Sequence, residues 1–329
     1  WDDLPTPKYN TNYYRSSDLL MSISKQTYGI NKRILTEFGY KNWQFSYIPH
    51  GINHEKYYKV NEKDFDFFNF KQKFNFDKYD FKILYLNRNI RRKMPGDFVL
   101  AYKHFLEQIS EEDRKKCCLI FHTAPVDENG TDLKAVCEAM IPEYNVIFTY
   151  DKFNQAFDDV QMNYIYNVAD VFMNIASNEG FGLGSAEALM TETPIIVNVT
   201  GGLQDQCGFK NDDGSYLTED DYIELESNHR GKYKNHGEWV KPVFPSNISL
   251  QGSPLTPYIF DDRCQYEDAG DAIKYWYDKT PKEREECGKK GREFLLRQDI
   301  GMSAKNMNNR FIDSMDSVFK NFKPSPSFV

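Results

Sequence analysis

The sequence contains no long apolar run. No stretch approaches the roughly 20 consecutive apolar residues that a membrane-spanning helix needs. The first residues also lack the basic start and apolar middle of a secretory signal. These absences predict a protein without a transmembrane segment that works in the cytoplasm, with peripheral contact to a membrane left open.

Cysteine motifs and excess positive charge are lacking as well. The six cysteines show no C-x-x-C spacing, which predicts reduced thiols rather than a zinc site or a disulfide framework. The net charge is −8, and nucleic-acid binding needs clustered Lys and Arg, so we expect no nucleic-acid partner. No G-x-G-x-x-G follows the first strand of the main domain, which disfavours a dehydrogenase.

From residue 81 onward, apolar strands and amphipathic helices alternate. Strands are predicted at 81–88, 117–123, 145–150, 171–176 and 194–199, and helices at 95–109, 132–140, 162–170 and 185–190. Such alternation is typical of an α/β fold with a doubly wound, Rossmann-like parallel sheet. Ligands of these sheets bind at the carboxyl ends of the strands.

The chain divides into four predicted parts. Residues 1–60, with strands at 18–24 and 45–53 around a helix at 25–39, are interpreted as the end of a first lobe, and 61–80 as an irregular connector. Residues 81–302 form the main domain, in which 205–258 is too long for an ordinary connection and is treated as an insertion. Residues 303–329 provide a last helix and a tail. Because the first residue is Trp1 rather than Met, we leave open that the chain is a fragment.

The stretch ASNEGFGLGSAEALMTETPIIV, residues 176–197, places two glutamates around a glycine-rich loop. Its glycines leave backbone amides uncovered, and a helix beginning near Ser185 adds its unpaired N–H groups, so the loop predicts an anion site. Glu179 and Glu187 would accept hydrogen bonds from ligand hydroxyls. The combination predicts a site for a sugar nucleotide; on these residues alone, a solvated surface loop is the alternative.

A second cluster, NRNIRRK at 87–93, follows the first strand of the same domain. Arg88 and Lys93 are therefore expected to project toward the same crevice and to meet a diphosphate, because charge-assisted hydrogen bonds are stronger than exposed ion pairs. Arg91 and Arg92 are expected to be solvated or to help only loosely. An ordinary basic turn is the alternative.

Taken together, these motifs resemble the retaining glycosyltransferases of family 4, which have the two-lobed GT-B fold. The resemblance rests on the E-x7-E block EGFGLGSAE, on the following TPIIV and GGL, on NRNIRRK in place of G-R-x4-K, and on SDLLMSIS and IPHGIN in the first lobe. It covers about residues 18–204 and resumes loosely over 264–319.

The resemblance implies a role for each matching residue. Arg88 and Lys93 would hold the donor diphosphate and neutralise the leaving group, Glu179 would contact the donor sugar, and Glu187 would hold the ribose. The remaining donor-binding positions lie in the loop, where backbone amides would face sugar and phosphate: Phe181, Gly182, Leu183 and Gly184.

The donor's base is placed near Thr149 and Tyr150, after the strand that faces the nucleotide in such sheets. Members of the family generally need no metal, and we expect no cofactor besides the nucleotide-sugar substrate. The one D-x-D, Asp64 to Asp66, lies in the connector and is interpreted as accidental. Within the insertion, Trp239 and Lys241 are candidates for a lid or acceptor surface, with an inert loop as the alternative.

The predicted function is retaining transfer of a sugar from a nucleotide diphosphate to a glycan, lipid or protein acceptor. The sequence departs from the family in its first lobe, which lacks the glycine-rich loop and the histidine near the sugar, so the acceptor lobe is interpreted as truncated. The alternatives are a non-catalytic module that binds sugar nucleotides or glycans, and a sugar-nucleotide epimerase of the same fold.

Overall fold

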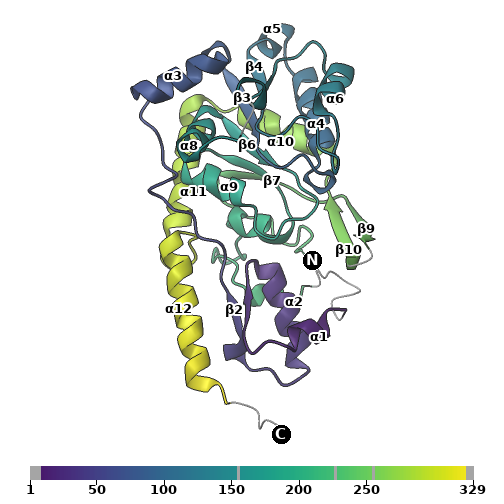
Figure 1. Ribbon diagram of the computed structural model, residues 1–329, viewed down its shortest axis with the longest axis vertical. Coiled ribbons are helices and arrows are strands. Elements are labelled where there is room, and N and C mark those ends of the chain that lie inside the picture. Colours follow the sequence, from purple (N-terminus) through teal and green to yellow (C-terminus); the bar gives the residue numbers. More distant parts are fainter. Residues whose placement is uncertain (1–8, 154–155, 226–227, 254–255, 324–329) are drawn as a thin grey trace.

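The computed structural model describes residues 9–153, 156–225, 228–253 and 256–323. Its centre is a six-stranded parallel sheet in the order β5-β4-β3-β6-β7-β8 (Figure 1). The strands are β3 (Phe81–Tyr85), β4 (Cys117–Phe121), β5 (Val146–Phe148), β6 (Val171–Asn174), β7 (Ile195–Asn198) and β8 (Val240–Val243). The predicted α/β class and doubly wound parallel sheet are confirmed.

Helices cover both faces of this sheet. One face packs against α4 (Pro95–Glu107), α6 (Leu133–Met140) and α10 (Tyr266–Tyr277). The other packs against α8 (Asp159–Val168), α9 (Leu183–Met190) and the end of α11 (Pro281–Leu296). The short helices α5 (Glu111–Arg114) and α7 (Tyr150–Phe153) lie in connections. Burial on both faces explains why β4 is apolar throughout and why β6 and β7 are apolar up to their last residues, Asn174 and Asn198.

The first lobe is small and lies below the main sheet in Figure 1. It contains α1 (Thr11–Tyr14) and a parallel pair of strands, β1 (Leu20–Ser22) and β2 (Phe45–Tyr47), joined by α2 (Lys25–Thr36). The last helix, α12 (Ala304–Asn321), returns beside this lobe, and Ser314 Oγ donates to Ser46 Oγ over 2.8 Å. No helix among the described residues combines the length and the apolar character needed to cross a bilayer.

The prediction of an irregular connector is wrong for residues 65–74. These form α3 (Phe65–Phe74), whose buried face consists of Phe67, Phe70 and Phe74. Asp64 caps the helix by accepting a hydrogen bond from the Phe67 amide at 2.8 Å. Asp64, the first aspartate of the D-x-D motif, is therefore a helix cap. The helical period of the segment was not recognisable in the sequence because phenylalanines occur on all sides of the helix.

The predicted insertion contributes to the main sheet. Its β8 pairs with β7, while β9 (Asn247–Ser253) forms an antiparallel hairpin with β10 (Thr256–Arg263). Trp239 is 5% exposed and stacks on Phe294 with ring centroids 4.7 Å apart. The Lys241 ammonium lies 4.7 Å from the ring centroid of Tyr275. The idea that Trp239 belongs to a lid is thus wrong, because its ring fills the core beneath α11.

Candidate functional site

The candidate site lies where the strand order reverses. From β3 the chain proceeds outward through β4 and β5, and then returns to β6 on the other side of β3. The loops after β3 and β6 therefore lie side by side at the carboxyl edge, where ligands of such sheets bind. A hydrogen bond from the Ser177 amide to the Arg92 carbonyl, 2.8 Å long, joins the two loops directly.

The glycine loop presents a bare helix start, as predicted. Gly182 has φ of 87°, and a Cβ at this position would lie 2.4 Å from the Leu203 side chain, so only glycine fits. Helix α9 begins at Leu183, two residues earlier than predicted. Gln206 Nε2 donates to the carbonyls of Phe181 and Gly182 over 2.7 and 3.1 Å, which holds this turn in place. Leu203 and Gln206 could not be recognised from the sequence, because they are about 20 residues away from the loop along the chain and contact it only in the folded structure.

Lys93 and Glu179 meet in this crevice. Lys93 Nζ contacts Glu179 Oε1, and each residue is only 9% exposed. Asn174 Nδ2 lies 3.4 Å from the same carboxylate oxygen. Burial lowers the pKa of Lys93, and the neighbouring carboxylate opposes that shift. The structure thus brings together two of the three predicted catalytic residues.

The third predicted residue, Arg88, lies elsewhere. Its side chain is 63% exposed, and its Nε pairs with Asp127 Oδ2 at 2.9 Å. Arg92 occupies the crevice instead: its Nη1 lies 3.3 Å from Glu179 Oε2 and donates to the Asn178 carbonyl over 3.0 Å. Of the two alternatives predicted for Arg92, solvation is wrong, because its side chain is 31% exposed and contacts Glu179. A 3-10 turn over Arg91–Lys93 rotates Arg92 and Lys93 inward, which residue spacing alone does not reveal.

Glu187 faces the interior beside α8. The hydroxyl of Tyr166 donates to Glu187 Oε2 over 2.7 Å, and burial raises the pKa of this carboxyl group. Gly184 lies nearby, where a Cβ would be 3.6 Å from the Leu86 carbonyl at the end of β3. The first turn of α9 therefore touches the end of β3.

The region predicted to bind the base contains an additional residue. Thr149 is fully buried, and its Oγ1 lies 2.7 Å from His122 Nδ1. Tyr150 begins α7, and its ring centroid is 5.2 Å from that of His122. His122 directly follows β4, and sequence reasoning treated it only as part of that strand. Its position at the carboxyl end of a predicted strand was the feature of the sequence that could have marked His122 as a candidate site residue.

A small cavity beside Glu179 joins three parts of the molecule. The first lobe, the loops after β6 and β7, and the hairpin strand β10 all contribute to its lining: Ser24, Gln26, Thr27, Asn178, Glu179, Gly180, Thr200, Gly201, Phe260 and Asp262. Gln26 Oε1 accepts a hydrogen bond from the Gly201 amide at 3.1 Å, which ties the lobes together here. The involvement of β10 has no signature in the sequence.

Several buried polar atoms near this edge lack a hydrogen-bond partner within the described residues. They include Asn87 Nδ2 after β3, Asn178 Oδ1 after β6 and Ser185 Oγ in the first turn of α9. Leaving such atoms unsatisfied costs free energy, so they indicate where a polar ligand would bind. In the same described residues, no group of three His, Cys, Asp or Glu side chains is arranged to hold a metal ion.

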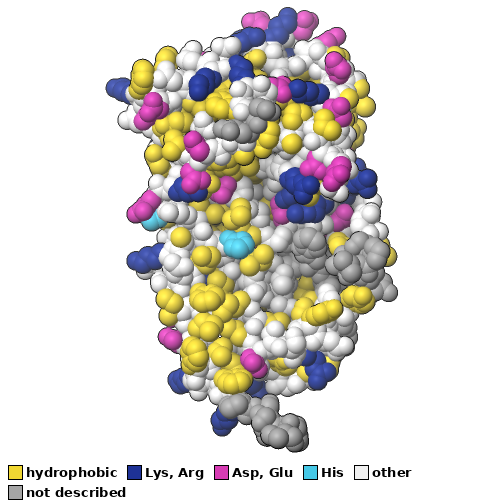
Figure 2. Space-filling view, viewed as in Figure 1, with side chains coloured by type: hydrophobic (Ala, Val, Ile, Leu, Met, Phe, Trp, Pro, Cys, Tyr) yellow, Lys and Arg dark blue, Asp and Glu magenta, His cyan; other side chains and the backbone are white. Residues whose placement is uncertain are grey.

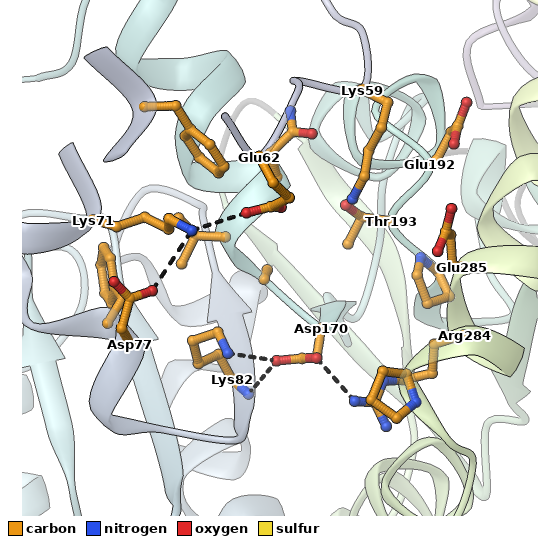
Figure 3. Close-up of a pocket in the computed structure, with 17 residues that line it drawn as sticks. Lys59, Glu62, Lys71, Asp77, Lys82, Asp170, Glu192, Thr193, Arg284 and Glu285 are labelled. Carbon is orange, nitrogen blue, oxygen red and sulfur yellow. Dashed lines mark hydrogen bonds and ion pairs between the residues drawn. The ribbon is translucent and has the colours of Figure 1, made fainter. Parts of the chain in front are cut away.

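A larger cavity, of about 290 Å³, lies at the opposite, amino edge of the sheet (Figure 3). Asp170 is held between Lys82, at 3.0 Å, and Arg284, at 2.9 Å. Lys71 similarly pairs with Glu62 at 2.9 Å. None of the unpartnered buried side-chain atoms found in the described residues lines this cavity.

A scan of the sequence against protein-family models gives no match, and a search of the curated proteins gives none either. Solved structures are similar in fold. Sucrose-phosphate synthase from Thermosynechococcus elongatus aligns with a TM-score of 0.62 and 18% identity, over 96% of this chain and 62% of that one. A glycosyltransferase from Rickettsia africae gives a TM-score of 0.64 and 13% identity, over 96% and 67%.

Anabaena HepE, solved in complex with UDP and glucose, aligns with a TM-score of 0.62 and 12% identity, over 94% of this chain and 66% of that one. The chain thus spans less than two thirds of the length of both the synthase and HepE. At these identities the likeness establishes the architecture alone. The chain has the GT-B type of α/β fold that these transferases share.

Proposed function

We propose that this chain is a glycosyltransferase that moves a sugar from a nucleotide diphosphate to an acceptor with retention of configuration and without a metal. The observation that carries the proposal is the buried contact between Lys93 and Glu179, beside the bare start of α9. A cation for a diphosphate and a carboxylate for sugar hydroxyls thus share one crevice. HepE, with its UDP and glucose, shows that this fold accommodates such ligands.

In this proposal, catalysis is electrostatic. The amides at the start of α9 and the Lys93 ammonium receive the diphosphate, and they stabilise it most strongly as negative charge develops on the leaving group. The bond from the sugar's anomeric carbon to the phosphate oxygen breaks while the acceptor oxygen bonds to the same face of that carbon. The acceptor's proton passes to the departing phosphate oxygen. Glu179 orients the sugar, and Glu187 receives the ribose hydroxyls.

Arg88 completes the diphosphate site by moving away from Asp127. Their ion pair is largely exposed on the arginine side, and exposed pairs contribute little to stability. A diphosphate offers the guanidinium a bidentate, charge-assisted alternative. Arg92 then remains on Glu179 as a positioning residue that keeps the carboxylate oriented.

The acceptor side is proposed to need more of the first lobe than these residues supply. Hydrophobic side chains gather at the lower left of Figure 2, where α12 runs, and Phe311, Ile312 and Phe319 of that helix are at least half exposed. A further α/β segment beside β1 and β2 would cover this surface. These 329 residues alone are expected to bind the nucleotide but to transfer sugar poorly. Rapid turnover by them would contradict this part of the proposal.

The test is a thermal shift series with UDP, GDP, ADP and their sugar conjugates, followed by hydrolysis and transfer assays with the tightest ligand. Binding raises the melting temperature once the ligand exceeds its Kd. Failure of all these ligands to bind would refute the proposal. Binding without hydrolysis or transfer, even when further first-lobe sequence is added, would favour a non-catalytic module. The lack of the family's glycine-rich loop and histidine in residues 1–60 favours this candidate.

A further inference from the structure

His122 stands one strand away from the diphosphate crevice. Its amide donates to the Tyr85 carbonyl over 2.9 Å, so the ring lies beside the end of β3. Neighbouring strands are about 4.8 Å apart, which places His122 about 10 Å from the end of β6 and its glutamate loop. That separation matches the distance between a nucleotide's base and its diphosphate.

The ring also lies on the appropriate face of the sheet. Side chains alternate along a strand, so His122 shares a face with Ile120, which packs in the same core as Tyr166 of α8 and Ala186 of α9. Glu187 contacts Tyr166 on this face. A nucleoside whose ribose meets Glu187 therefore extends along the face on which His122 lies.

The hydrogen bonds around His122 are compatible with a neutral ring that carries its hydrogen on Nδ1. The Thr149 hydroxyl has one hydrogen to donate. Its oxygen, Oγ1, lies 3.3 Å from the Phe121 carbonyl oxygen, which can only accept a hydrogen bond, and 2.7 Å from His122 Nδ1. If the hydroxyl donates to the carbonyl, Nδ1 donates to the hydroxyl, and the lone pair of the neutral ring is on Nε2. Burial lowers the pKa of His122 to about 4, so the ring is neutral near pH 7.

The ring is held firmly while Nε2 remains available. The Phe157 ring stacks on the His122 ring with centroids 4.2 Å apart, and the centroid of the Tyr150 ring lies 5.2 Å from that of His122. Within the described residues, Nε2 has no hydrogen-bond partner, although the ring as a whole is 7% exposed. In this tautomer the ring holds a single acceptor atom, Nε2, at the edge of the proposed nucleotide site.

We propose that His122 selects the donor's base by accepting a hydrogen bond at Nε2 from a ring N–H of uracil or guanine. Cytosine and adenine have a bare ring nitrogen at the equivalent position, so its lone pair would face that of Nε2. Thr149 acts as a positioning residue that fixes the tautomer. This inference rests on the proposed function, since it assumes that a nucleoside diphosphate binds here.

UDP and CDP provide a matched pair, because their bases have nearly the same size but opposite hydrogen-bonding character at the ring nitrogen. Calorimetry on the whole chain should show UDP binding at least about tenfold more tightly than CDP, a discrimination typical of one paired versus unpaired polar contact. If GDP is the tightest ligand, GDP and ADP form the equivalent pair. Binding of UDP and CDP, and of GDP and ADP, with equal affinities would overturn the inference, whereas binding of none of the four would refute the proposed function itself.

Two variants distinguish base reading from a structural role. His122→Phe keeps an aromatic ring against Phe157 but removes the acceptor, and it should reduce the UDP to CDP preference to near unity. Thr149→Val releases Nδ1, so Nε2 can carry the hydrogen, and the preference should move toward CDP. Retention of the full UDP preference by both folded variants would overturn the inference.

The preference should also be independent of pH between about 5.5 and 8. The pKa of His122 lies near 4, so the ring stays neutral and Nε2 keeps its lone pair throughout this range. A UDP preference that declines as the pH falls from 7 to 5.5 would show that the ring becomes protonated there, which contradicts a neutral acceptor.

Discussion

The two edges of the main sheet carry similar charges with different surroundings. Lys82 lies at the start of β3 and Lys93 in the loop after it. Asp170 directly precedes β6, and Glu179 lies in the loop after that strand. Each edge therefore has a lysine paired with a carboxylate that lies just before or after β6. At the amino edge, Arg284 completes the network (Figure 3), and none of the unpartnered buried side-chain atoms found in the described residues lines the cavity there.

The carboxyl edge differs in what remains unsatisfied. The bare start of α9 and the unpartnered atoms of Asn87, Asn178 and Ser185 surround its ion pair. The larger cavity, at the amino edge, has no such atoms. A paired charge is found at both edges of the sheet, and the larger cavity lies at the edge without the candidate site. What distinguishes the carboxyl edge from the amino edge is the set of unsatisfied polar groups around the uncovered backbone of α9.

Replacing the two lysines gives the strongest test of this contrast. Lys93→Met should reduce sugar transfer by at least about a hundredfold, because loss of one electrostatic contact to a developing charge typically costs about 3 kcal/mol. Lys82→Met is the matched control and should leave kcat and KM within about twofold of the unchanged chain. The rates of both variants are measured in steady-state assays, with a form of the protein that transfers sugar. Equal losses in the two would remove the distinction between the edges.

The amino edge should respond in stability instead. Asp170→Asn leaves Lys82 and Arg284 without their shared carboxylate, and breaking such a largely buried ion pair from one side costs up to about 3 kcal/mol. Urea denaturation should therefore show a lower free energy of unfolding, while calorimetry at a temperature where the variant is folded shows unchanged UDP affinity. Loss of affinity in the folded variant would show that the amino edge takes part in binding.

The sequence predicted the repeating part of this architecture well. Strands and helices of the main domain were recognisable from their apolar periods, and the glycine loop from its residues alone. The helix α3 was missed because Phe65 and Phe68, which are exposed, obscure the buried face of a segment full of phenylalanine. The strand β8 was missed because a short apolar segment among turn residues does not reveal its pairing with β7.

The site could be predicted only in part, because local turns decide where long side chains point. Spacing placed Lys93 and Glu179 at adjacent strand ends, and they do meet. It could not show that Arg92 turns inward while Arg88 turns to Asp127. Nor could it reveal His122, whose position as a candidate depends on the hydroxyl of Thr149, a residue on another strand end.

Glu179→Ala examines the carboxyl edge more finely. The sugar conjugate should bind about 10- to 100-fold more weakly, as expected for loss of charged hydrogen bonds of about 1.5–3 kcal/mol. Bare UDP should bind as before or more tightly, since Lys93 loses its competing carboxylate. Calorimetry with UDP and with the preferred UDP-sugar separates the two effects. Equal weakening of both ligands would mean that Glu179 supports the nucleotide rather than the sugar.

The smallest expected effect contrasts two arginines. The Arg284 side chain is 7% exposed and paired with Asp170, whereas the Arg88 side chain is 63% exposed and paired with Asp127. Asp127→Asn should release Arg88 for the diphosphate and raise UDP affinity about threefold at low salt, with the gain shrinking as salt screens the charges. Arg88→Ala should weaken UDP and cancel the gain in the double variant. If Asp127→Asn leaves UDP affinity unchanged while Arg92→Ala lowers it, Arg92 rather than Arg88 serves the diphosphate, and the inward turn at Arg91–Lys93 is the feature that equips this edge for binding.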